Sequence, residues 1–207
     1  MEVDCPHLAA AMIVAMQATL LVLAGGESRR MGRSKAWLEV GDTTLLEWLV
    51  HRLAPAFSDV MVSFAAPEQL ETLVPYRVVF DRKPAAGPLS GIEAGLSAAR
   101  TNIAFAVACD MPFVTREIAE MAVASARTCD AAVPRIAGRP EPVCAAYGKS
   151  ALPAITTALD AGNLMASDVL SHLNVTWLEG FDVEQLRSLN TPEDYQRFHR
   201  DLRRGDN

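Results

Sequence analysis

The chain alternates short apolar runs with longer segments of helical periodicity, and this alternation limits the folds that it can adopt. Runs rich in valine, isoleucine, leucine and phenylalanine predict about seven strands, at residues 19–24, 59–64, 77–80, 103–109, 131–135, 143–147 and 175–178. Helical spacing predicts helices at residues 44–53, 88–99, 116–127, 150–161 and 192–202. Strands that alternate with helices form a mostly parallel sheet with helices on both faces. The sequence therefore predicts a three-layer α/β fold.

The two predicted strands that flank residues 138–142 are expected to form a hairpin, so the sheet would be mixed, with an antiparallel member. A chain of 207 residues, half of them apolar, is long enough for one well-buried domain and short for two. We expect a single domain over residues 18–207. Residues 1–17 are expected to be an extension, either disordered or the product of a start assigned too early.

The charge and hydropathy of the chain indicate which partners it can bind and where in the cell it is located. The net charge of −6 argues against a nucleic-acid surface, because a basic footprint supplies most of the affinity for nucleic acid. Glu2 and Asp4 stand where a signal peptide needs positive charge, and the apolar stretch after them is too short to cross a bilayer. We therefore expect a cytoplasmic protein that binds neither nucleic acid nor a membrane, and we expect it to be a monomer.

A loop rich in glycine and arginine follows the first predicted strand. Gly25 and Gly26 end the apolar run, and three arginines and Lys35 come within the next nine residues. Glycine lets main-chain N–H groups approach a ligand, while arginine and lysine neutralise phosphate charge. The loop is neither a P-loop, which ends in Gly-Lys-Ser/Thr, nor a G-x-G-x-x-G dinucleotide fingerprint. It predicts a site for a nucleoside triphosphate.

Two aspartates follow predicted strands and become candidates for the same site. Asp110 comes at the end of the strand at residues 103–109, and ligands of open α/β sheets bind at the carboxyl ends of strands. A lone carboxylate there suits Mg²⁺, which takes oxygen ligands from one or two carboxylates, phosphates and water. Asp81 leads into Gly87, Pro88 and Gly91, where a slender helix N-terminus would offer N–H donors to an anion.

Residues 23–35, Leu-Ala-Gly-Gly-Glu-Ser-Arg-Arg-Met-Gly-Arg-Ser-Lys, resemble the signature loop of nucleotidyltransferases that attach a nucleotide to a small phosphorylated acceptor. The form with two glycines and two arginines is most similar to the MobA-like family of molybdenum cofactor guanylyltransferases. Residues 109–112, Cys-Asp-Met-Pro, are similar to that superfamily's metal-binding motif, and residues 81–92 resemble the guanylyltransferases' Asp-x5-Gly-Pro-Leu-x-Gly-Ile segment. The resemblance covers nearly the whole chain from residue 19 onward.

This resemblance implies a Rossmann-like nucleotidyltransferase fold and the Mg²⁺-dependent transfer of GMP from GTP to the terminal phosphate of molybdopterin, with release of pyrophosphate. It also implies transient contact with proteins that deliver the cofactor or receive the product. The residues that it assigns to catalysis are Arg30, Lys35 and Asp110, with Asp110 as the metal ligand. Those that it assigns to the nucleotide are Leu23, Ala24, Gly25, Gly26, Lys35, Asp81 and Asp110, and those for the acceptor are Gly87, Gly91 and Asn190.

The sequence departs from the family pattern in three places. Residues 63–67 lack an asparagine motif that many members carry near the nucleotide, and residues 188–190 keep only the second of two asparagines. Residues 163–165 stand where some members have an arginine pair, and Arg135 and Arg139 could supply the missing cations. Two alternatives therefore stay open. One is a transferase that uses CTP with the same cofactor or acts on a sugar phosphate; the other is a nucleotide-binding carrier that has lost turnover.

Overall fold

The computed structural model describes residues 15–26, 34–84 and 86–205. Its main sheet contains the strands β1 (Met16–Leu23), β4 (Phe57–Phe64), β5 (Arg77–Phe80), β6 (Ile103–Ala108), β7 (Ala131–Ile136), β8 (Arg139–Pro140), β9 (Cys144–Gly148) and β10 (Val175–Leu178). A separate small hairpin joins β2 (Glu39–Val40) to β3 (Thr43–Thr44). The helices are α1 (Leu45–Leu53), α2 (Pro88–Ala98), α3 (Arg116–Ser125), α4 (Leu152–Asp160), α5 (Ala166–Leu170) and α6 (Pro192–Gly205).

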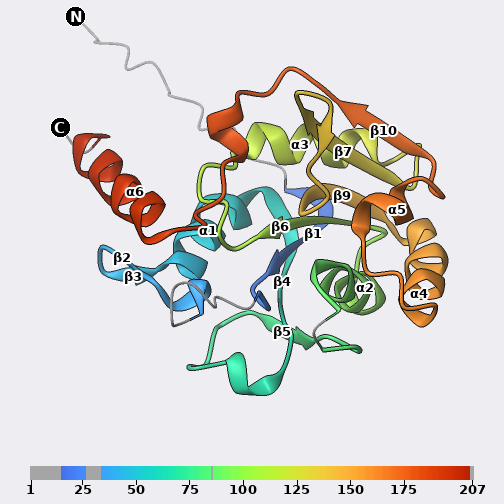
Figure 1. Cartoon of the computed structure of the whole chain (residues 1–207), viewed down its shortest axis with the longest axis horizontal. Helices are drawn as coiled ribbons and strands as arrows, with labels where there is room; N and C mark the ends of the chain where they lie inside the picture. Colours follow the sequence, from blue (N-terminus) through green and yellow to red (C-terminus); the bar gives the residue numbers. More distant parts are fainter. Residues whose placement is uncertain (1–14, 27–33, 85, 206–207) are drawn as a thin grey trace, which may run out of the picture.

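The main sheet is mixed, with the strand order β10-β7-β9-β6-β1-β4-β5 and with β8 attached to β7 (Figure 1). β1 pairs in parallel with β4 on one side and β6 on the other, so that Leu23 stands opposite both Ser63 and Ala108. β9 runs antiparallel to its two neighbours, β6 and β7. The predicted mixed sheet with an antiparallel member is confirmed, and the carboxyl ends of β1, β4 and β6 lie together at one edge.

A tight turn joins β7 to β8 at the position where the sequence predicts a hairpin. Ile136 pairs with Arg139, and the two residues between them have positive φ angles, 48° at Ala137 and 77° at Gly138. Two-residue hairpin turns with this pair of positive φ angles match the twist of the strands. The chain then returns as β9, which pairs with β7 deeper in the sheet.

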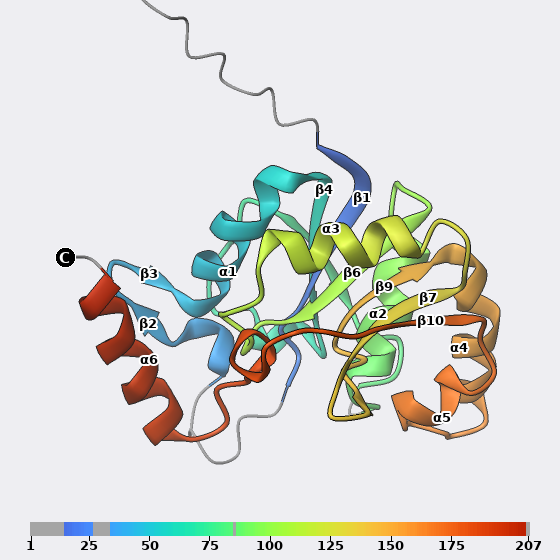
Figure 2. The same ribbon diagram turned by 90° about the horizontal axis from the view of Figure 1, so that it is seen from above.

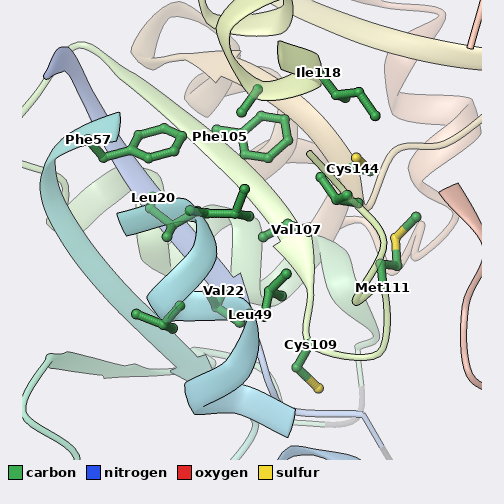
Figure 3. Close-up of a cluster of buried hydrophobic side chains, with 14 of the residues drawn as sticks. Leu20, Val22, Leu49, Phe57, Phe105, Val107, Cys109, Met111, Ile118 and Cys144 are labelled. Carbon is green, nitrogen blue, oxygen red and sulfur yellow. The ribbon is translucent and has the colours of Figure 1, made fainter. Parts of the chain in front are cut away.

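Helices cover both faces of the sheet, as the alternating pattern predicts (Figures 1 and 2). On one face α1 and α3 pack on alternate strand residues such as Leu20 and Phe105, and Phe57 stacks on Phe105 with 6.1 Å between ring centroids (Figure 3). On the other face α2, α4 and α5 pack on the intervening residues, among them Leu21 and Leu23. Because side chains alternate across a strand, β1 contributes to both cores.

Helix α6 lies apart from the sheet, beside α1 and the β2–β3 hairpin (Figures 1 and 2). Its buried Phe198 belongs to a third, small apolar cluster with Leu38, Val40, Leu45 and Leu189. Thr191 caps the helix, because its hydroxyl accepts a hydrogen bond from the N–H of Asp194 at 3.1 Å. This position places the start of α6 next to the edge of the sheet where β6 ends.

Several boundaries differ from the sequence prediction. β1 begins at Met16 rather than residue 19, and the helix predicted at residues 150–161 begins with a 3₁₀ turn, Lys149–Ala151, before α4. The short elements β2, β3 and α5 were not predicted, because pieces of two to five residues carry no detectable periodicity. The described cysteines, Cys109, Cys129 and Cys144, are free. Among the helices of the described part, none is long and apolar enough to span a membrane.

Candidate functional site

A cavity of about 560 Å³ opens at the carboxyl ends of β1, β4 and β6. Its lining comprises Leu23, Ala24, Gly25, Gly26, Lys35, Ser63, Ala65, Ala66, Gln69, Asp81, Pro84, Gly87, Pro88, Gly91, Ala108, Cys109, Asp110 and Val143. A second cavity, of about 670 Å³, lies between the β2–β3 hairpin and α6, and its lining includes no residue predicted for the site. The cavity at the sheet edge is therefore the candidate functional site.

The main chain that follows β1 forms the floor of this cavity. The N–H of Ala24 donates to the carbonyl of Ser63 at 2.8 Å, and the N–H of Cys109 donates to the carbonyl of Leu23 at 3.0 Å. A Cβ atom at Gly25 would lie 2.5 Å from the main-chain nitrogen of Ala65, so no larger residue fits there. A Cβ atom at Gly26 would meet no atom of the described residues within 4 Å. The first glycine is needed for close packing, and the second leaves main chain open to a ligand.

A glutamine that the sequence did not single out braces this floor. Gln69 ends a 3₁₀ turn, and its Oε1 accepts a hydrogen bond from the N–H of Ala65 at 2.8 Å. Its Nε2 lies 3.4 Å from the carbonyl oxygen of Gly25, to which it donates. The indole of Trp37 donates to the carbonyl of Gln69 at 2.8 Å and stacks on Phe64 with 5.9 Å between ring centroids. Gln69 thus brings a side-chain amide to a site where residues 63–67 offer none.

Asp81 and the first turn of α2 form one wall of the cavity. The hydroxyl of Ser63 donates to Oδ1 of Asp81 at 3.1 Å. Burial raises the pKa of Asp81 to about 6; the hydrogen bond from Ser63 opposes this rise, and the charge of Glu93 adds to it. A Cβ atom at Gly91 would lie 3.0 Å from the Ser63 hydroxyl and 3.1 Å from Leu23 Cδ2, so glycine keeps the helix close to this wall.

Lys35 connects the side chains of Asp110 and Asn190. Its Nζ lies 2.7 Å from Oδ2 of Asp110 and 2.9 Å from Oδ1 of Asn190, and it donates to both. The side chains of Lys35 and Asp110 are only 17% and 19% exposed, so water screens this ion pair less than it would a surface pair. The N–H of Leu189 also donates to the main-chain carbonyl of Asp110 at 2.8 Å. Asp110 is therefore held by contacts from two distant segments of the chain.

The structure brings together almost all of the predicted site residues that it describes. Nine of them line the cavity, namely Leu23, Ala24, Gly25, Gly26, Lys35, Asp81, Gly87, Gly91 and Asp110. Asn190 does not line it but contacts Lys35. Arg30 lies outside the described residues, so its assignment to catalysis stays a prediction. The sequence pattern missed Ser63 and Gln69, because no local signal ties either of them to the glycine loop.

The two arginines suggested for the acceptor lie around the β7–β8 hairpin, and neither lines the cavity. The guanidinium carbon of Arg135 lies 3.5 Å from the centroid of the Trp177 ring. A cation over an aromatic face is a stable packing arrangement in its own right. Arg139 is exposed at the start of β8. Their use by an acceptor stays a prediction.

The donor atoms of the site fit a metal ion only if a ligand supplies part of its coordination. Among the described residues, no group of three or more histidine, cysteine, aspartate or glutamate side chains could hold a metal. Asp110 offers one carboxylate at the open edge of the sheet. Mg²⁺ accepts such a site, because it is commonly bound through one or two carboxylates together with substrate phosphates and water.

Comparisons with known proteins agree with this geometry. A profile of the MobA-like NTP transferase domain matches residues 20–175. A probable molybdenum cofactor guanylyltransferase of Pelotomaculum thermopropionicum is 35% identical over 186 residues, which cover 86% of this chain and 90% of the relative. One of Methanosarcina mazei is 37% identical over 195 residues, covering 85% of this chain and 87% of the relative.

One solved structure has a fold similar to that of this chain. The crystal structure of molybdopterin-guanine dinucleotide biosynthesis protein A from Archaeoglobus fulgidus superposes with a TM-score of 0.79 and 27% sequence identity. The superposition covers 90% of this chain and 99% of that one. The matched domain begins in β1 and includes Lys35, Asp81 and Asp110. This chain belongs to the MobA-like NTP transferase family and is a nucleotidyltransferase.

Proposed function

We propose that this protein transfers GMP from GTP to the terminal phosphate of molybdopterin, forming the guanine dinucleotide form of the cofactor and pyrophosphate, with Mg²⁺ as the metal. The observation that carries the proposal is the position of Lys35 between Asp110 and Asn190 at the edge of a cavity whose floor is the main chain of residues 23–26. The names of the relatives from Pelotomaculum and Methanosarcina support guanine and the molybdenum cofactor as substrates.

The reaction needs positioning and charge neutralisation more than proton transfer. A phosphate oxygen of the acceptor attacks the α-phosphorus of GTP, and the bond from that phosphorus to the β-phosphate bridging oxygen breaks as pyrophosphate leaves. The attacking phosphate is already ionised at neutral pH, so no general base has to activate it. The protein therefore has to hold two anionic ligands in line and offset their charge.

Lys35 is suited to the triphosphate. Its ammonium group is a compact cation on a flexible stem, so it can turn from Asp110 towards a more highly charged anion without any movement of the main chain. Asn190 accepts a second hydrogen bond from the same Nζ. Charge-assisted contacts of this kind stabilise the negative charge that grows on the leaving pyrophosphate.

Asp110 would hold the Mg²⁺ ion, because its carboxylate is at the open edge of the cavity. An Mg²⁺ ion held by Asp110 would supply positive charge that offsets the repulsion between the two anionic substrates. Asp81 is on another wall, where its carboxylate can accept hydrogen bonds from a bound nucleotide. Main-chain groups of residues 23–26, braced by Gln69, would receive the base and ribose.

The proposal is tested by measuring pyrophosphate release with purified molybdopterin cofactor and either GTP or CTP. We expect release with GTP, dependent on both Mg²⁺ and the cofactor, and little release with CTP. A preference for CTP would favour the cytidylyltransferase alternative. Tight GTP binding with no transfer to any acceptor would favour the carrier alternative.

A further inference from the structure

The turn that precedes α6 links Asp194 to the site through hydrogen bonds. Oδ2 of Asp194 accepts hydrogen bonds from the N–H of Asn190 at 3.0 Å and from the N–H of Thr191 at 2.9 Å. The Thr191 hydroxyl donates to the same oxygen at 3.0 Å. The side chain of Asn190 in turn accepts a hydrogen bond from Lys35. One carboxylate thus fixes the residue that contacts the lysine.

Other contacts hold helix α6 in place without Asp194. Phe198 is buried and makes edge-to-face contacts with Trp48 and Phe113, at 6.0 and 5.4 Å between ring centroids. The hydroxyl of Tyr195 donates to the main-chain carbonyl of Glu39, and Nε2 of His199 lies 2.9 Å from the same oxygen. The helix is anchored by its buried face, so losing Asp194 should free the turn and not the whole helix.

Asp194 closes the capping box with Thr191, and it also accepts a hydrogen bond from the N–H of Asn190, one residue outside the cap. Although partial burial opposes it, hydrogen bonds from Asn190 and Thr191 hold the pKa of Asp194 below its usual value. Glu193 stands one residue earlier, is exposed, and brings the same charge to the same helix end. An acidic residue near a helix N-terminus is favourable wherever it stands in the first turn. Asp194 differs from Glu193 in its hydrogen bonds to residues 190 and 191 and in the nearby charge of Arg187.

We propose that Asp194 is a positioning residue for the reaction, which fixes Asn190 and through it the ammonium group of Lys35. The proposal rests on the proposed function in one respect: the anion that Lys35 meets is taken to be the triphosphate of the nucleotide. When that anion draws Lys35 away from Asp110, Asn190 remains as a fixed acceptor about which the lysine turns. A loose Asn190 would leave the ammonium group spread over several positions, which lowers the rate more than it lowers binding.

A double-mutant cycle tests this chain of contacts. Asp194→Ala and Asn190→Ala are each expected to lower kcat for GTP by about tenfold, and the double variant should be within about twofold of either single variant. Residues that act through one another give such non-additive losses. Asp194→Asn keeps an acceptor oxygen and should recover most of the activity. It also serves as the testable variant if Asp194→Ala does not fold.

Glu193→Ala is the matched control, because it removes the same charge from the same helical turn and should leave kcat within about twofold of wild type. Losses that multiply to about a hundredfold in the double variant, or a Glu193→Ala loss equal to that of Asp194→Ala, would overturn the proposal.

Equilibrium binding of a fluorescent GTP analogue, without any acceptor, separates this proposal from the proposed function. If the inference holds, the affinity for the GTP analogue falls in Asp194→Ala and does not fall further when Asn190→Ala is added. The affinity for a corresponding GMP analogue is unchanged in both variants. That pattern in a protein that transfers no GMP would overturn the proposed function and leave the inference standing. Normal GMP transfer by wild type, with independent effects of the substitutions at residues 190 and 194, would overturn the inference and leave the proposed function standing.

Discussion

Asp81 and Asp110 are the same residue type at the same edge of the same sheet, yet their surroundings are opposite. Asp81 has a neutral hydroxyl as its partner, at 3.1 Å, and burial raises its pKa to about 6. Asp110 has the ammonium group of Lys35 at 2.7 Å. Both line the candidate site. Position at a strand end makes a carboxylate available, but the neighbouring side chains decide whether it faces a cation or neutral donors.

This contrast suggests a division of roles. A carboxylate that already pairs with a cation can exchange that cation for another, which suits Asp110 to the metal and phosphate end of the site. A partly buried carboxylate that accepts a hydrogen bond from a hydroxyl suits neutral donors, because burial penalises its ionised form. Removing the charge of each residue in turn should therefore affect turnover to different extents.

Removing the charge of Asp110 should have the largest effect. Asp110→Asn keeps the shape of the side chain but loses the anionic ligand, and we expect kcat to fall by at least about a hundredfold. Pyrophosphate release with GTP, Mg²⁺ and cofactor measures the change. Far-UV circular dichroism should show a folded protein, because the amide oxygen can still accept a hydrogen bond from Lys35.

Asp81→Asn is the control for that experiment and should retain more activity than Asp110→Asn. Equal losses in the two variants would break the contrast between the two carboxylates. Normal turnover by Asp110→Asn would show that the metal is held elsewhere.

The second largest effect is expected at Lys35. Lys35→Ala removes the cation that pairs with Asp110, and affinity for GTP should fall by about tenfold or more while affinity for GMP changes little. Isothermal titration with the two nucleotides checks this. Lys149→Ala, which removes an exposed lysine outside the cavity, is the matched control. An equal loss for GTP and GMP would place Lys35 away from the β- and γ-phosphates.

A third prediction concerns stability and pH at Asp81. Its pKa is about 6 in the folded state and near 3.9 in an unfolded chain, so between these values the unfolded state releases a proton that the folded state keeps. The contribution of Asp81 to stability therefore falls as pH rises from about 4 to about 6 and then levels off.

Asp81→Asn should lack this contribution. The free energy of unfolding of the variant minus that of wild type should therefore be larger at pH 7 than at pH 4, by roughly 2 kcal/mol after solvent screening is allowed for. Urea unfolding at both pH values measures the difference. Glu193→Gln, at an exposed position, should track wild type. A constant difference between Asp81→Asn and wild type across this range would show that the carboxylate is not perturbed.

The smallest expected effect is at Ser63. Its hydroxyl lowers the pKa of Asp81, so Ser63→Ala should raise that pKa above about 6, by less than about one unit. Carboxyl-carbon NMR titration of Asp81 would detect the shift. Ser58→Ala, at an exposed position on the same strand, is the control. No change in Ser63→Ala would mean that the Ser63 hydrogen bond does not affect the pKa of Asp81.

Local pattern was enough to predict much of the fold. The strand at residues 77–80 and the strand at residues 175–178 have the predicted bounds, because turn residues enclose each apolar run. The capping boxes at Thr44 and Thr191 mark helix starts within one residue. Prediction failed for α5 and the β2–β3 hairpin, whose few residues are held by contacts and not by periodicity.

Neighbouring residues encode the glycine-rich loop that follows a buried strand and the end of the strand before Asp110, because strand ends and turns are local features. The partners of these residues depend on how the whole chain folds. Lys35 reaches Asp110 across 75 positions and Asn190 across 155, and Gln69 reaches Gly25 across 44. Such contacts form when the whole sheet and α6 have packed, since their geometry depends on the relative placement of elements that no local pattern specifies.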